Sequence, residues 1–349
     1  MKAIVYPRHG GSDVVECRQE FPDIEPAPGE ALVRVRATGV NRVDLVSREG
    51  YPGIGIAFPH IPGGDIAGEV VSFGNNGAAD DAAKAGISTG TRVVAYPLIA
   101  CGGCELCAAG RPNLCLNWKF IGLHTDGGYA EYARVPVENL IPLPDSVSFE
   151  AAAALPVAGL TAFHAIKTVG NLQPGETFFI WGGGGGLGTF AVKLAKSIDT
   201  KVIATAGAAW KLDEIRKLGA DFVLDRTKVD VAAEVKRIAP NGVDFVVNYV
   251  GSDAFPASFE MLKRGGRMVL CGMLTGRESP LSLHMTYLRH LSIHGVYLGT
   301  KAEMTELVSM LASNQISPHI GATLPLSDAR KAQELMAQGE VVGKIVLVP

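Results

Sequence analysis

A run of five glycines, continued by Leu187 and Gly188, constrains the fold of this chain more than any other feature. It lies between an apolar, strand-like segment at residues 177–181 and a segment whose apolar residues have helical spacing. Within it, Gly183, Gly185 and Gly188 satisfy the pattern G-x-G-x-x-G. In a strand–turn–helix setting such glycines permit a tight turn and close approach of a pyrophosphate. The pattern predicts a dinucleotide site; a flexible loop without a ligand is the competing interpretation.

The residues around this turn predict an α/β domain with a parallel sheet. Continuous apolar segments at residues 201–205, 222–224, 245–248 and 267–270 are typical of strands covered on both faces. Helical patterns separate them, and such alternation favours β–α–β units. A helix is also expected at residues 302–312.

The first part of the chain has a different pattern. Short alternating apolar segments, such as residues 32–36, 69–73 and 92–96, predict antiparallel strands of a mostly β domain. Near Ala151 a helix-compatible segment begins, with interruptions expected at Pro156 and Gly159. Residues 75–88 are polar and alanine-rich, which we interpret as a surface loop. A chain of 349 residues is long enough for two domains.

Four cysteines follow the spacing C-x2-C-x2-C-x7-C: Cys101, Cys104, Cys107 and Cys115. Four thiolates can surround one tetrahedral zinc and leave no open position, which describes a structural site. Disulfides are the alternative, but nothing in the sequence indicates secretion, and cytosolic thiols stay reduced. We therefore predict one structural zinc.

Charge and hydropathy argue against several classes of partner. The net charge is −3, so neither nucleic acid nor an anionic membrane is an expected partner. The N-terminus lacks the apolar segment of a signal peptide, and no stretch approaches the ~20 apolar residues of a membrane span. The expected location is the cytoplasm.

The end of the second strand of the parallel sheet indicates which dinucleotide binds. NAD sites of this kind place an acid there to hold the ribose hydroxyls. The sequence has no acid between Ala204 and Gly207, and Lys211 follows shortly. A neutral turn with a nearby cation favours the 2′-phosphate of NADP, so NADP(H) is predicted over NAD(H). The alternative is that Lys211 is an ordinary solvated side chain.

Several motifs in sequence order resemble the medium-chain dehydrogenase/reductase superfamily, which includes zinc alcohol dehydrogenases and quinone oxidoreductases. They are residues 39–44, 62–70, 126–132, 155–162 and 343–349. The resemblance spans essentially the whole chain. It implies a GroES-like, mostly β catalytic domain at residues 1–152 and 298–349, with a zinc lobe at about 96–120. It also implies a doubly wound Rossmann domain at residues 153–297, and a homodimer or homotetramer.

The chain departs from that family at its catalytic zinc. Where zinc alcohol dehydrogenases have three zinc ligands, this sequence has Asn41, Gly64 and Val157, and Val43 replaces a proton-relaying Ser or Thr. Asp65 alone cannot replace three ligands. In these positions the chain resembles zinc-independent quinone oxidoreductases and enoyl reductases, although those relatives often lack the cysteine lobe.

Without a catalytic metal, hydride transfer needs an acceptor that is already activated. We predict an NADPH-dependent oxidoreductase acting on a quinone, an enone or an enoyl thioester. The catalytic candidates are Tyr51 as proton donor, Asn41 as a hydrogen-bonding group and Asp65 as an orienting group. Two alternatives remain open: an alcohol dehydrogenase with an unusual metal site, and an inactive nucleotide-binding homologue.

The resemblance also assigns cofactor contacts. It implies Thr161 near the nicotinamide, the backbone of the glycine turn at the pyrophosphate, and Lys344 at a phosphate. The remaining assignments are Gly184, Gly186 and Leu187 in the turn, Thr205 and Lys211 at the adenosine ribose, and Val250, Gly272 and Tyr297 beside the nicotinamide.

Overall fold

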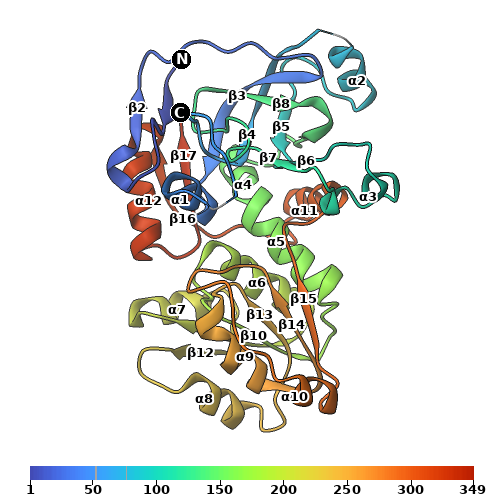
Figure 1. Ribbon diagram of the computed structural model, residues 1–349, viewed down its shortest axis with the longest axis vertical. Coiled ribbons are helices and arrows are strands. Elements are labelled where there is room, and N and C mark those ends of the chain that lie inside the picture. Colours follow the sequence, from blue (N-terminus) through green and yellow to red (C-terminus); the bar gives the residue numbers. More distant parts are fainter. Residues whose placement is uncertain (52, 76) are drawn as a thin grey trace. The chain divides into compact units, whose positions relative to one another are not determined.

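The computed structural model describes residues 1–51, 53–75 and 77–349, and it divides into two compact units (Figure 1). Unit 1 consists of Met1–Ala158 and Thr300–Pro349, and unit 2 is the continuous segment Gly159–Gly299. Among the described residues, every helix is too short or too polar to cross a lipid bilayer.

Unit 2 is built on a six-stranded, entirely parallel sheet. Its spatial order is β12-β11-β10-β13-β14-β15, so β10 lies between β11 and β13 and the chain reverses its winding direction there. In open α/β sheets, ligands bind at such a switch point, beyond the carboxyl ends of the strands. The strands are β10 (Thr177–Ile180), β11 (Lys201–Ala206), β12 (Phe222–Asp225), β13 (Val243–Asn248), β14 (Leu262–Leu270) and β15 (Ser292–Gly295).

Helices connect these strands, and the predicted α/β class with a doubly wound parallel sheet is confirmed. The residues from 155 to 169 form π-helical turns on both sides of the short α5, close to the expected interruptions. The helices are α5 (Leu160–Phe163), α6 (Gly186–Ser197), α7 (Ala209–Lys217), α8 (Val231–Ile238), α9 (Phe255–Met261) and α10 (Leu283–Leu288).

Unit 1 contains a seven-stranded sheet in which β3 is the longest strand. Its order is β16-β17-β3-β4-β5-β9, and β8 also pairs with β3. The strands are β3 (Glu30–Gly39), β4 (Asp65–Phe73), β5 (Arg92–Ala95), β8 (Tyr132–Pro136), β9 (Leu140–Pro142), β16 (Ile320–Pro325) and β17 (Lys344–Val348). Two small sheets pair β1 (Ala3–Val5) with β2 (Glu16–Arg18) and β6 (Leu98–Ile99) with β7 (Lys119–Phe120).

The strand register of unit 1 brings three distant segments together. Gly39, at the end of β3, pairs with Asp65 at the start of β4 and with Val346 in β17. A Cβ on Gly39 would lie 2.5 Å from the carbonyl oxygen of Ala153, so only glycine fits at this crossing. The helices of the unit are α1 (Arg42–Glu49), α2 (Ala78–Lys84), α3 (Glu105–Ala108), α4 (Phe149–Ala153), α11 (Lys301–Ala312) and α12 (Ala329–Gln338).

The interpretation of residues 75–88 as a loop is wrong, because α2 lies within it. Ala78 and Ala82, one helical turn apart, are buried in the core of the sheet. Asp80 and Asp81 lie in the first turn, where negative charge interacts favourably with the helix dipole. Asn76 lies outside the described residues.

Candidate functional site

The glycine turn follows β10. At each of its three motif glycines, a different neighbouring residue leaves no room for a side chain. A Cβ on Gly183 would lie 2.8 Å from the Cβ of Ala204, which brings the turn close to β11. On Gly188 a Cβ would clash with the Gly182 carbonyl, so helix and strand approach closely there. At Gly185 the nearest atom to that position is the hydroxyl oxygen of Tyr249, at 2.7 Å.

The helix that follows the turn presents its amino end to this position. Gly185 is the N-cap of α6, and the 12-residue helix begins at Gly186 with Leu187 next. The first N–H groups of a helix have no partner within it and carry a partial positive charge, which suits an anionic group such as pyrophosphate.

Thr205 has a structural role at the start of the glycine turn. It is completely buried, and its hydroxyl accepts a hydrogen bond from the backbone N–H of Gly182 at 2.9 Å. The assignment of Thr205 to the adenosine ribose stays a prediction from the resemblance. Thr205 fixes the start of the glycine turn to β11.

A cation that the sequence analysis missed lies beside the carboxyl end of β11. Arg226 directly follows β12, and its guanidinium lies 2.5 Å from where a Gly207 Cβ would be. Partial burial lowers the pKa of the Lys211 ammonium, and the nearby Arg226 guanidinium lowers it further. No described residue hydrogen-bonds or ion-pairs with the Arg226 guanidinium. In the sequence, Arg226 could have been recognised as a candidate because it directly follows the predicted strand at residues 222–224.

Asp225, next to Arg226, is not at the position where an NAD site has its ribose-binding acid, the end of β11. Asp225 lies at the end of β12 and accepts hydrogen bonds from the backbone N–H and the hydroxyl of Thr227, at 3.0 and 2.6 Å. These bonds hold the pKa of Asp225 below its usual value. The charges at the end of β11 are therefore those of Lys211 and Arg226.

Three of the other residues assigned to the cofactor follow the ends of neighbouring strands of the parallel sheet. Val250, Gly272 and Tyr297 follow the carboxyl ends of β13, β14 and β15. Gly272 packs directly on the backbone of Tyr249, whose carbonyl leaves no room for a Cβ. Thr161 is buried in α5.

In unit 1, Lys344 and Asp65 form a buried ion pair, and Asn41 hydrogen-bonds to both. The Lys344 ammonium donates to Asp65 Oδ2 at 2.8 Å, to Asn41 Oδ1 at 2.6 Å and to the Val40 carbonyl at 2.9 Å. Lys344 is 1% exposed and Asp65 is 0% exposed. The second carboxylate oxygen of Asp65 accepts from the Val157 N–H at 2.9 Å.

The assignment of Lys344 to a cofactor phosphate is corrected by these contacts. An ammonium has three N–H donors, and all three bind atoms of unit 1. Asn41 is likewise engaged, because its amide also donates to Asp65 Oδ2 at 2.7 Å. Asp65 orients both neighbours. The cluster lies where the resemblance puts a catalytic zinc. The side chains at the three ligand positions, Asn41, Gly64 and Val157, include no thiolate, imidazole or carboxylate, so they do not fit that metal.

Asp44 lies next to this cluster with one of its oxygens unpaired. Its Oδ2 accepts from the Asn41 N–H at 2.8 Å and from the Tyr129 hydroxyl at 2.9 Å. Among the described residues, Asp44 Oδ1 alone is a buried side-chain oxygen or nitrogen without a partner. Burial raises the pKa of Asp44 to about 7, although the two hydrogen bonds oppose that rise.

We expect this carboxyl to make stability depend on pH. The folded protein holds a proton on Asp44 that the unfolded chain releases near pH 4. The free energy of unfolding therefore falls as pH rises from about 4 to above 7, by roughly 1.4 kcal/mol for each pH unit in that window. Asp44→Asn keeps an acceptor for both bonds but does not titrate. The melting temperature of the variant relative to that of wild type should therefore rise between pH 5 and pH 8. The exposed Asp145→Asn is the matched control, and parallel pH profiles for D44N and wild type would contradict the assignment.

Tyr51, the candidate proton donor, directly follows Gly50, the C-cap of α1. Its side chain is half-buried, and its carbonyl accepts a hydrogen bond from the Ile54 N–H at 3.1 Å. The next residue, Pro52, lies outside the described part of the chain.

The four cysteines converge in the segment that contains α3. Their sulfurs all lie within 4.8 Å of one another, and Cys104 Sγ is 3.5 Å from Cys107 Sγ and 3.9 Å from Cys115 Sγ. A tetrahedral zinc with Zn–S bonds of about 2.3 Å places its sulfurs about 3.8 Å apart. Backbone N–H groups lower the pKa of Cys104 to about 6, whereas burial raises the pKa of Cys107 to about 12. The four sulfurs fit one tetrahedral metal ion.

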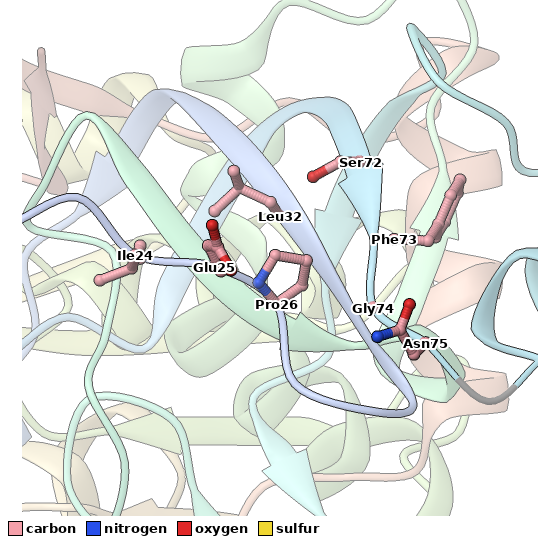
Figure 2. A pocket seen from close by; sticks show the side chains of 8 residues that line it. All are labelled: Ile24, Glu25, Pro26, Leu32, Ser72, Phe73, Gly74 and Asn75. Atoms are coloured by element: carbon pink, nitrogen blue, oxygen red, sulfur yellow. The ribbon is translucent and has the colours of Figure 1, made fainter.

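A separate surface groove of about 280 Å³ lies beside β3 and β4 (Figure 2). Figure 2 shows that its walls come from the segment before β3, from β3 itself and from the end of β4, with Glu25, Leu32 and Phe73 respectively. None of the candidate site residues lines it.

Comparisons with known proteins agree with this architecture. Residues 27–145 match the alcohol dehydrogenase GroES-like domain, and residues 186–313 match the zinc-binding dehydrogenase family. An alcohol dehydrogenase of Geobacillus stearothermophilus is 33% identical and covers 91% of this chain and 92% of its own. A crystal structure of an NAD-dependent alcohol dehydrogenase is 34% identical, with a TM-score of 0.91 and 100% coverage of both chains. A mycobacterial protein complexed with NADPH is 28% identical, with a TM-score of 0.83 and 100% coverage of both.

A GroES-like unit combined with a parallel dinucleotide-type sheet defines an oxidoreductase of the alcohol dehydrogenase superfamily. The chain belongs to the medium-chain dehydrogenase/reductase superfamily, as a zinc-type alcohol dehydrogenase-like protein. The resemblance inferred from the sequence is thereby confirmed.

Proposed function

We propose that this protein is an NADPH-dependent reductase that transfers hydride to a quinone, an enone or an enoyl thioester without a catalytic zinc. The observation that carries the proposal is the buried ion pair of Lys344 and Asp65. Zinc needs thiolate, imidazole or carboxylate ligands. Here the only carboxylate of the set is already bound by an ammonium, an amide and a backbone N–H.

The absence of suitable zinc ligands favours acceptors that need no Lewis acid. NADPH would supply the hydride, and conjugation to a carbonyl would already polarise the acceptor. Tyr51 remains our candidate for delivering the accompanying proton. Asn41 and Asp65 would act by holding the end of β3 in place, since their side chains bind each other.

A panel assay with purified protein tests the proposal. We expect NADPH oxidation with quinones, enones or enoyl thioesters, and no oxidation of simple alcohols. Alcohol oxidation together with a second bound zinc would favour the alcohol dehydrogenase alternative, which the names of several relatives support. Dinucleotide binding without turnover of any acceptor would favour an inactive homologue.

The preference for NADP(H) rests on the two cations at the end of β11. Arg226 and Lys211 suit a 2′-phosphate, and the neutral Gly207 leaves room for it beside the guanidinium. The names of the relatives do not support this preference, because several are NAD-dependent alcohol dehydrogenases, although two related structures hold NADP or NADPH.

Arg226→Ala should weaken NADPH binding by about 10- to 100-fold, the value of a charge-assisted hydrogen-bonded contact. NADH binding should change little, because NADH lacks the phosphate. Dissociation constants from fluorescence titration measure both. Arg237→Ala, an exposed arginine of α8, is the matched control. An equal loss for the two dinucleotides would count against a 2′-phosphate site.

We also propose that the protein forms homodimers through unit 2. Among the described strands, β15 pairs only with β14 and is the last strand of its sheet. Leu283 (74% exposed) and Tyr287 (67% exposed) lie on α10 nearby in the sequence. An open edge with exposed apolar side chains suits pairing with a second copy. We expect light scattering to give a dimer for wild type and the Val229→Glu control, and a monomer for Leu283→Glu/Tyr287→Glu. A monomeric wild type would refute this interface.

A further inference from the structure

Tyr249 is the first residue after β13, and its side chain reaches the glycine turn that follows the neighbouring strand β10. Its hydroxyl donates a hydrogen bond to the Gly182 carbonyl. The same oxygen lies 2.5 Å from the Cβ position of Gly182 and 2.7 Å from that of Gly185. Tyr249 therefore bridges the two strands at the switch point of the sheet.

The space beside Gly185 is the space that a dinucleotide needs. The second glycine of G-x-G-x-x-G lacks a side chain so that the pyrophosphate can approach the backbone. In this chain the Tyr249 hydroxyl occupies that approach. Its proton is directed to Gly182, so while that bond lasts the hydroxyl does not donate to an incoming phosphate. The volume that the hydroxyl occupies therefore opposes binding while this contact persists.

We propose that Tyr249 is a gate on the dinucleotide site: its hydroxyl closes the pyrophosphate position and must leave Gly182 before the dinucleotide binds. The gate rests on the proposed function, since it presupposes that a dinucleotide binds at this turn. The closed state lowers the fraction of binding-competent protein, and the apparent dissociation constant rises in proportion.

The variant Tyr249→Phe separates a gate from a ligand. It removes only the hydroxyl, and the nearest remaining ring carbon, Cζ, lies 3.6 Å from the Cβ position of Gly185. We expect Y249F to bind NADPH about 3- to 10-fold more tightly, the population shift that corresponds to one hydrogen bond of ordinary strength. The association rate in stopped-flow fluorescence should rise with it.

Two controls accompany this measurement. Tyr132→Phe removes a hydroxyl in unit 1 and should leave NADPH binding unchanged. Adenosine 2′-monophosphate, which has no pyrophosphate, should bind Y249F and wild type equally. Unchanged or weaker NADPH binding by Y249F would overturn the gate, and weaker binding would make Tyr249 a ligand of the pyrophosphate. If folded wild type binds no dinucleotide, the proposed function itself fails, and the gate fails with it.

Discussion

Replacing Lys344 by methionine should lower the stability of unit 1 by about 3–5 kcal/mol, the usual cost of removing one partner of a buried ion pair. Methionine fills a similar volume but leaves the Asp65 carboxylate buried without its cation. Asn41 and the Val40 carbonyl lose their donor at the same time. Thermal unfolding followed by circular dichroism should show a midpoint lower by roughly 10 °C.

The double variant K344M/D65N distinguishes a lost charge pair from lost packing. With both charges removed, no uncompensated ion remains, and most of the lost stability should return. The exposed pair of Lys84 and Asp81 provides the control, because K84M should leave the melting midpoint almost unchanged. Two results would show that the ion pair does not hold these strands together. One is the same unfolding midpoint for K344M and wild type, and the other is a double variant no more stable than K344M.

Without zinc, we expect the segment that contains the four cysteines to lose its folded structure, because few large side chains are buried around these cysteines. Of the four cysteines only Cys115 is buried, and Leu114 and Leu116 beside it are exposed. We propose that zinc organises these residues. Mass spectrometry under native conditions should find one zinc per chain, and Cys104→Ser/Cys107→Ser should contain none. Limited proteolysis should then cut between residues 101 and 117 in the variant, while wild type resists.

Cys17→Ser is the control for this experiment, since Cys17 is exposed and outside the cluster. It should retain one zinc and resist proteolysis. Two zinc ions in wild type would mean that a metal also binds elsewhere. A wild type with no metal and four reactive thiols would exclude the structural zinc.

Local patterns predicted much of the fold because neighbours in sequence determine them. The strand before the glycine turn and the amphipathic helix after it were expected from periodicity alone. The helix α2 was missed because only Ala78 and Ala82 are buried, which leaves too weak an apolar stripe. Alanine and charged residues in a short segment suit a helix as well as a loop.

The contacts of the site were harder to predict, because they join residues that are far apart in sequence. Arg226 and Lys211 meet only because β12 lies beside β11. Tyr249 reaches the glycine turn because β13 is the other neighbour of β10. Lys344 was expected at a phosphate, and only the pairing of β17 with β3 places it against Asn41 and Asp65.

The strand β17 also has a consequence for biosynthesis. Asp65 and Lys344 are separated by 279 residues, and the whole of unit 2 lies between them in the chain. Unit 2 is continuous and can fold while the ribosome is still making the C-terminal residues. Asp65 acquires its cation only when the segment Lys344–Val348 emerges. A nascent chain stalled before residue 344 would therefore leave the end of β3, at Thr38 and Gly39, without its partner strand and open to chaperones and to other chains.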